Sequence, residues 1–199
     1  MILEWKEITV HLKDFFSISG KPQPYYLNEL GLHLVLPGNL HIAKLGISKR
    51  QAKRNAKRME KDISYRSFCL TMTGFKCLLL AKKPDNSYLA CSIRPISNRN
   101  EAMVMDEYDN LRRAYIELIK LEYREYSRVY LEHFPRQISI SDHPFDLSEI
   151  DIRIPERIVE RTRVYHTQYN GFEVLFVMVS KNEKLIQEMS ECINGLRFS

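Results

Sequence analysis

The sequence lacks the clustered glycines on which nucleotide-binding loops depend. In those loops, neighbouring glycines let several backbone amides approach a phosphate group. The seven glycines of this 199-residue chain are scattered, and no two of them lie closer than seven residues apart. Neither a Walker loop nor a dinucleotide-binding fingerprint is present, so we predict no nucleotide cofactor.

Metal-binding and hydrolytic motifs are missing as well. The six histidines form no H-x-H or H-E-x-x-H pair, the four cysteines form no C-x-x-C pair, and the chain has no G-x-S-x-G elbow. The sequence therefore predicts no catalytic residue, no metal ligand and no cofactor, and we expect a protein that is not an enzyme. A site assembled across the fold from separate cysteines and histidines stays open at this stage.

Long apolar runs are also absent. The longest spans Val174 to Val179, whereas a membrane-spanning helix needs about 20 apolar residues. Glu4 and Glu7 lie where a signal peptide would carry a basic patch and an apolar region. We therefore expect a soluble, unexported, cytoplasmic protein with no transmembrane segment. In that compartment the cysteines are expected to be buried free thiols, at Cys69, Cys77, Cys91 and Cys192.

The positive charge of the chain is concentrated in residues 48–62. The chain has 30 Lys and Arg against 25 Asp and Glu, and this segment alone holds seven of the bases and two of the acids. The rest of the chain is balanced, so the net charge of +5 belongs to this segment. Its bases recur at helical spacing, which predicts a helix near 48–62 with cations over most of its circumference. The candidate partner-binding bases are Lys49, Arg50, Lys53, Arg54, Lys57 and Arg58.

Turn signals and periodicity predict a mostly antiparallel sheet flanked by helices. Pro-Asp-Asn at residues 84–86 separates two apolar runs, and Asn170-Gly171 separates two more, so each pair of runs is expected to form a hairpin. Apolar residues at helical spacing predict a long helical segment near 100–134, which Pro135 would end. A further helix is expected over 181–193, after the second hairpin. The order of these elements predicts a single α+β domain over residues 1–199.

The long helical segment is rich in tyrosine, which has two uses that the sequence leaves open. Tyrosine combines a large apolar ring with a polar tip, so it suits both core packing against the sheet and a surface that binds a partner. Five of the eleven tyrosines fall in this segment. The candidates for a partner surface are Tyr123, Tyr126 and Tyr130.

The C-terminal part of the chain resembles a known family. A strand over Tyr165–Gly171 is followed by the apolar strand Val174–Val179, a helix that begins Ser-Lys-Asn-Glu183, and the ending Ile193-Asn-Gly-Leu-Arg-Phe198. This pattern resembles the ending of the PsbP-like family, which also includes bacterial DcrB-like proteins and Eag-type secretion chaperones. The resemblance implies an α/β/α sandwich around an antiparallel sheet and a non-enzymatic accessory or binding role. It carries over no functional residue.

Two hypotheses of function follow. The first is a non-catalytic protein-binding module, such as a bacterial immunity protein or a secretion-associated chaperone or adaptor, whose partner is a protein with an acidic surface. The alternative is a nucleic-acid-binding protein that uses the basic helix 48–62. No aromatic residue lies between Ser48 and Asp62, so this helix offers no platform on which bases could stack. This absence favours the protein partner.

Overall fold

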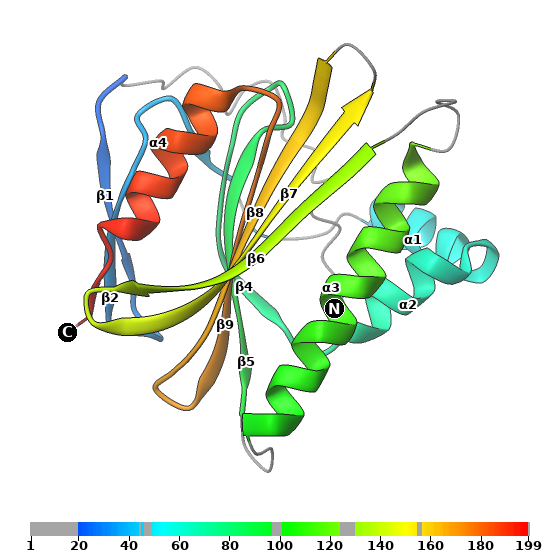
Figure 1. Cartoon of the computed structure of the whole chain (residues 1–199), viewed down its shortest axis with the longest axis horizontal. Coiled ribbons are helices and arrows are strands. Elements are labelled where there is room, and N and C mark those ends of the chain that lie inside the picture. Colours follow the sequence, from blue (N-terminus) through cyan, green and yellow to red (C-terminus); the bar gives the residue numbers. More distant parts are fainter. Residues whose placement is uncertain are drawn as a thin grey trace.

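A seven-stranded antiparallel sheet forms the centre of the protein and separates two layers of other elements (Figure 1). The computed structural model describes residues 20–43, 45, 49–96, 101–123, 130–154 and 157–198. The strand order is β3-β4-β5-β9-β8-β7-β6. The strands are β3 (His41–Ile42), β4 (Lys76–Lys82), β5 (Tyr88–Pro95), β6 (Tyr130–Ile140), β7 (His143–Ile154), β8 (Arg157–Tyr169) and β9 (Phe172–Ser180).

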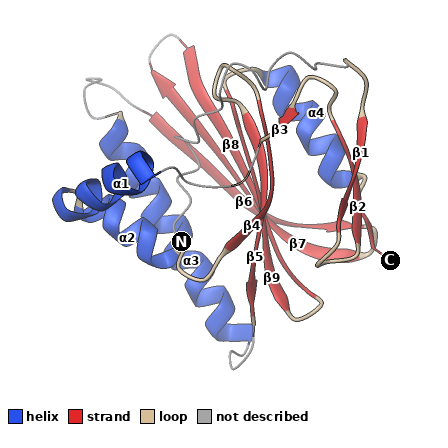
Figure 2. Cartoon of the chain, turned by 180° about the vertical axis from the view of Figure 1, so that it is seen from behind, coloured by secondary structure: helices blue, strands red, loops and turns tan. Residues whose placement is uncertain are grey.

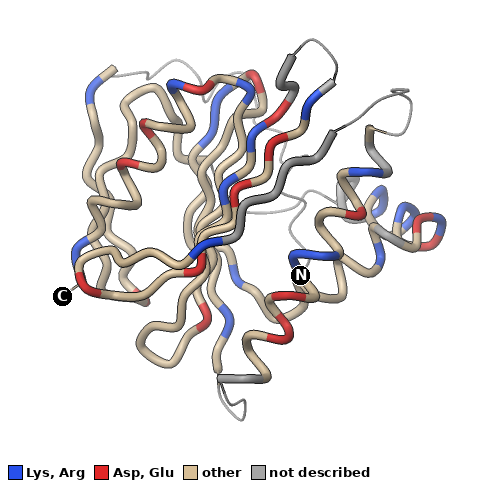
Figure 3. The backbone as a smooth tube through the Cα atoms, viewed as in Figure 1, with Lys and Arg blue, Asp and Glu red and all other residues tan. Residues whose placement is uncertain are grey.

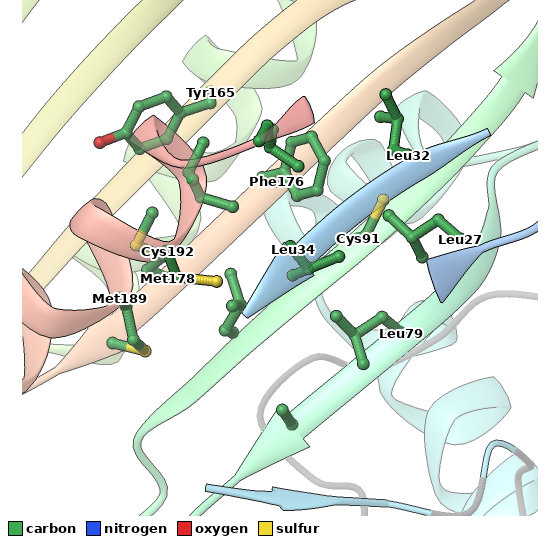
Figure 4. Close-up of a cluster of buried hydrophobic side chains, with 14 of the residues drawn as sticks. Leu27, Leu32, Leu34, Leu79, Cys91, Tyr165, Phe176, Met178, Met189 and Cys192 are labelled. Carbon is green, nitrogen blue, oxygen red and sulfur yellow. The ribbon is translucent and has the colours of Figure 1, made fainter. Parts of the chain in front are cut away.

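One face of this sheet is covered by helix α4 (Glu183–Asn194) and by a small second sheet. That sheet has the order β1-β2-β10 and consists of β1 (Gln23–Leu27), β2 (Leu32–Leu36) and β10 (Arg197–Phe198). Figure 4 shows the apolar core that results, to which Leu34 from β2, Met189 from α4 and Phe176 from β9 all contribute. Leu32, Leu34 and Leu36 alternate with exposed residues along β2, and this alternation is what lets a short strand contribute to a core.

The opposite face carries three helices, which Figure 2 shows from behind. They are α1 (Lys49–Lys61), α2 (Ile63–Thr71) and α3 (Glu101–Glu122). A second apolar cluster joins α2 and α3 to the sheet, and Tyr108, Leu111 and Leu118 of α3 meet Phe68 of α2 within it. Helix α1 packs on α2, so the basic helix lies in the outermost position of this layer.

The C-terminal predictions are confirmed. Asn170 and Gly171 have positive φ angles of 48° and 76°, which a tight hairpin turn requires, and they connect Tyr169 to its partner Phe172. Helix α4 begins at Glu183 with Asn182 as its N-cap, where the side chain accepts a hydrogen bond from the Leu185 amide. The hairpin predicted at residues 84–86 is also present, between β4 and β5. The basic helix predicted near 48–62 is α1.

The long helical segment predicted near 100–134 is wrong in its second half. Helix α3 ends at Glu122, and Tyr130–Ile140 is a strand that pairs with β7 along its whole length. Tertiary pairing overrides the local spacing of apolar residues here, because Tyr, Leu, Phe and Ile also suit a sheet. Pro135 does not end a helix. It lies in β6, the edge strand of the sheet, where proline is tolerated because one side of the strand needs no hydrogen bonds within the sheet.

The four cysteines are free and buried, as the sequence predicts. Burial raises the pKa of the Cys77 thiol to about 11 and that of Cys192 to about 12. These two thiols therefore stay protonated and unreactive near neutral pH. None of the helices that the structure describes is long and apolar enough to cross a membrane.

Candidate functional site

The basic helix α1 presents a row of exposed cations. Lys53, Lys57 and Lys61 follow one another at intervals of four residues, which places them on one side of the helix, and Arg54 lies beside them. All four side chains are exposed. Within the described part of the chain, none of the four lies within ion-pair distance of a carboxylate. Figure 3 shows these basic segments at the outer edge of the molecule, away from the sheet.

Of the six predicted bases, Lys53, Arg54 and Lys57 belong to this row and Arg58 does not. Arg58 is turned inward: its guanidinium lies 4.2 Å from the centre of the Tyr65 ring, and its Nε lies 3.8 Å from Oδ2 of Asp62. These contacts connect α1 to the beginning of α2, so Arg58 has a structural use. The side chains of Lys49 and Arg50 lie outside the described residues.

Helix α2 adds exposed aliphatic side chains next to the cations. Ile63 is 78% exposed and Leu70 is 61% exposed. They lie seven residues apart, two helical turns, with exposed Arg66 between them, so they share the outer side of α2. Tyr65 and Phe68 occupy the other side and are buried. The α1–α2 surface is defined here as Lys53, Arg54, Lys57, Lys61, Ile63, Arg66 and Leu70.

Of the three tyrosines predicted for a partner surface, Tyr123 alone has a described side chain. Tyr123, just after α3, is half-buried, and its hydroxyl donates a hydrogen bond to Oε2 of Glu160 on the sheet at 3.3 Å. Tyr130 lies in strand β6, and its side chain is outside the described residues, as is the whole of Tyr126. Tyr123 therefore packs against the sheet and does not form part of a free surface.

A ladder of alternating charges crosses β6, β7 and β8 on the α4 side of the sheet, and Figure 3 shows it as blue and red segments in turn. Each member pairs with the next at 2.8 to 3.8 Å. The ladder lines a groove of about 560 Å³ whose other wall is α4. Every cation in the ladder already has a carboxylate, which makes the groove a poor site for another ion. The charge ladder consists of Arg136, Glu149, Arg163, Asp151, Arg161 and Glu183.

A buried polar cluster lies between α3 and the other face of the sheet. His166 on β8 is 1% exposed, and its ring lies between the carboxylates of Asp146 and Glu173. Glu173 also pairs with Arg94, whose Nη2 lies 2.7 Å from Oε2 of Glu173 and 2.6 Å from Oε2 of Glu107 on α3. We call Arg94, Tyr108, Asp146, His166 and Glu173 the His166 cluster.

These groups have no arrangement typical of a catalytic or metal site. Neither ring nitrogen of His166 hydrogen-bonds to a serine or cysteine among the described residues. No group of three or more His, Cys, Asp or Glu in the described ranges is placed to hold a metal ion. The cavity between α2, α3 and the sheet is apolar and measures about 40 Å³, which is too small for an organic substrate.

The sequence analysis predicted neither the charge ladder nor the His166 cluster, but the sequence contains a signal for the charge ladder. Charged residues recur at every second position in β7 and in β8, as Glu149 and Asp151 and as Arg161 and Arg163. This period of two places them on one face of neighbouring strands, so the charge ladder could have been anticipated. The His166 cluster combines side chains from five separate elements, and no local spacing indicates it.

The fold is similar to that of a known protein. No protein-family model matches the sequence, and no curated protein sequence matches it either. Among solved structures, the chain matches cyanobacterial PsbP (CyanoP) from Synechocystis sp. PCC 6803 with a TM-score of 0.54 and 10% sequence identity. The match covers 90% of this chain and 94% of that one. The likeness extends well beyond the C-terminal residues from which the resemblance was drawn, and it shows that the protein has a PsbP-like α+β fold.

Proposed function

We propose that this protein is a non-catalytic protein-binding module that docks an acidic partner protein on its α1–α2 surface. The observation that carries the proposal is the combination, on one pair of helices, of four exposed cations that have no carboxylate partner among the described residues with two strongly exposed aliphatic side chains. The net charge of +5 lies in this region, so the long-range electrostatic attraction of the molecule is directed from it. The candidates for such a module are a bacterial immunity protein and a secretion-associated chaperone or adaptor.

The composition of the surface favours a protein over a nucleic acid. Nucleic acids are bound by cations that contact phosphates and, in single strands, by aromatic rings that stack on bases. The aromatic residues of α2, Tyr65 and Phe68, are buried and cannot stack. Ile63 and Leu70 would stay exposed to water beside a phosphate backbone, whereas an apolar patch surrounded by charge is the usual anatomy of a protein interface.

The cations and the aliphatic residues of the α1–α2 surface are expected to affect different rate constants of binding. The cations accelerate association with an acidic surface, and added salt screens them. The aliphatic residues lose water on binding and therefore slow dissociation. Removal of charge should act mainly on the association rate, and removal of Ile63 and Leu70 mainly on the dissociation rate.

The proposal is tested by affinity capture from the native organism followed by binding kinetics with the captured protein. The charge variant replaces Lys53, Arg54, Lys57 and Lys61 with Gln and leaves Arg58 in place because Arg58 contacts Tyr65. The apolar variant combines Ile63→Ser and Leu70→Ser. A matched control replaces four exposed bases on other elements with Gln: Arg113, Lys181, Lys184 and Arg197.

The proposal expects an acidic protein that binds the wild type and the control equally. The charge variant should associate several-fold more slowly, and the apolar variant should dissociate faster. The charge variant and the control should fold, since exposed charges contribute about 0 to 1 kcal/mol each to stability. The apolar variant should fold as well, because Ile63 and Leu70 are exposed. Salt-sensitive binding of duplex DNA or single-stranded RNA that is lost in the charge variant and kept in the apolar variant would instead establish the nucleic-acid alternative.

A further inference from the structure

His166 occupies a position in which both ring nitrogens face an anion. Its Nδ1 lies 3.6 Å from Oδ2 of Asp146 on β7, and its Nε2 lies 3.4 Å from Oε1 of Glu173 on β9. Glu173 is 0% exposed, and neither nitrogen of His166 has a hydrogen-bond partner in the described part of the chain. The imidazole is therefore surrounded by negative charge and shielded from water.

This geometry fits the protonated ring and neither neutral tautomer. The imidazolium carries N–H groups at both nitrogens, so it presents one donor to each carboxylate. A neutral ring has a single N–H, and whichever nitrogen carries it, the lone pair of the other points at a carboxylate. Deprotonation thus removes one attraction and introduces a repulsion where little water can weaken it.

The same ring supports helix α3. Tyr108 of α3 stacks on His166 with ring centres 4.0 Å apart and the planes inclined by only 6°. A cation over an aromatic face is attracted to it more strongly than a neutral ring. The Tyr108 hydroxyl shares a hydrogen bond with Ser148 of β7, which fixes the ring over His166. The protonation of His166 therefore acts directly on the contact between α3 and the sheet.

The charges that face this ring come from every element packed around it. Besides Asp146 and Glu173, α3 contributes Glu107, which pairs with Arg94 of β5, and Arg112, which pairs with Asp109 at 2.9 Å. Edge strand β6 contributes the neutral Gln137, which donates to Asp146. The guanidinium of Arg94 pairs with Glu173 and Glu107, so a protonated His166 is the cation that lies between the carboxylates of Asp146 and Glu173.

We propose that His166 is a proton-operated latch that holds α3 on the sheet while it is protonated and loosens α3 when it loses its proton. Because α2 packs on α3 and α1 packs on α2, the latch also affects how firmly the outer helices are held. This inference does not depend on the identity of any partner.

The direction of the pH dependence follows from the charges. Burial alone would lower the pKa of His166, but Asp146 and Glu173 outweigh burial and raise it above its ordinary value. A raised pKa means that protonated His166 stabilises the docked α3 fully below about pH 6.5, the pKa of an unfolded histidine. This contribution is lost as the pH rises through the pKa of the folded protein.

The test follows His166 and α3 separately in the full-length protein. Histidine-labelled NMR gives the titration of His166 between about pH 5.5 and pH 9, a range that includes the ordinary histidine pKa. Hydrogen exchange, corrected for the intrinsic effect of pH, gives the protection of the α3 amides, with the α4 amides as an internal reference. The latch predicts that α3 loses protection several-fold with the same midpoint as His166, while α4 does not change.

Two variants separate the latch from a general effect of pH. In Asp146→Asn, which removes a partly exposed carboxylate, the His166 titration and the loss of α3 protection should move together to lower pH. In His166→Gln, α3 should have low protection that no longer depends on pH. His33→Gln, which removes an exposed histidine on β2, should behave as the wild type.

Several results would overturn the proposal. They are a His166 pKa at or below the ordinary value, α3 protection that stays constant while His166 titrates, and a midpoint of α3 loosening that does not move in Asp146→Asn. If His166→Gln fails to fold, the comparison of wild type with Asp146→Asn still decides between latch and no latch.

Discussion

The two faces of the central sheet hold their covering layers by different physics. On the α4 side, the contact is apolar throughout its centre, where α4 and β2 bury leucine, isoleucine and methionine against the sheet. On the α3 side, an apolar cluster is combined with hydrogen bonds from Tyr108, Tyr115 and Tyr123 to the sheet and with the His166 cluster. Apolar burial responds little to pH or salt, whereas the His166 cluster contains a histidine between two carboxylates and responds to pH. The difference indicates that α4 belongs to the permanent core and that α3 is the layer whose attachment can be adjusted.

The largest expected effect is on the α4 side, with Met189→Asp. Met189 is fully buried between α4 and the sheet, and truncation of such a residue to Ala already costs about 2 to 5 kcal/mol. A carboxylate there has no partner, so the total loss should reach the whole stability of a domain of this size, and we expect an unfolded protein by circular dichroism. Met103→Asp, at an exposed methionine of α3, is the control and should melt as the wild type does. A folded Met189→Asp would show that α4 is not part of the core.

The next effect is on the α3 side, with Arg94→Met. This change leaves the buried carboxylate of Glu173 without its guanidinium, and loss of one partner from a buried pair costs roughly 3 to 5 kcal/mol in urea unfolding. The double variant Arg94→Met with Glu173→Gln should recover much of this loss, because the unpaired charge is then removed. Additive losses in the double variant would mean that the two side chains act independently, contrary to the structure.

The smallest expected effect is at Tyr108, where one variant removes only the hydroxyl and a second variant removes the whole aromatic ring. Tyr108→Phe removes the hydrogen bond to Ser148 and keeps the stack on His166, so the free energy of unfolding should fall by about 1 kcal/mol. Tyr108→Leu also removes the stack and should lower the pKa of His166, which the phenylalanine variant should leave nearly unchanged. An equal pKa of His166 in both variants would show that the Tyr108 ring does not favour the protonated form of His166, contrary to the latch.

The same contrast explains what could be predicted from the sequence. The elements around α4 have strong local signals, such as the positive-φ pair Asn170-Gly171 and the apolar face of residues 185–193, and they were placed correctly. The end of α3 was not, because Tyr130–Ile140 contains apolar residues at spacings compatible with both a helix and a strand, and only its pairing with β7 decides. The spacing of bases in residues 48–62 predicts the exposed row on α1, but it does not indicate that Arg58 contacts Tyr65 and Asp62, because those contacts depend on how α2 turns away from α1. The His166 cluster is a product of the topology, since α3, β5, β7, β8 and β9 each contribute one of its members.

The charge ladder has a consequence for how copies of this protein behave at high concentration. Strands β6, β7 and β8 reach beyond α4 toward the free edge of the sheet, and two flat, apolar sheets can stack face to face about 10 Å apart as the first step of aggregation. Any sheet that stacked on the ladder would have to strip water from its charges, including Arg136 at the edge, and would supply no compensating partners. Pro135, which has no backbone N–H, lies in β6 at the edge of the described sheet, so this part of the sheet is poorly suited to self-association across its face and along its edge.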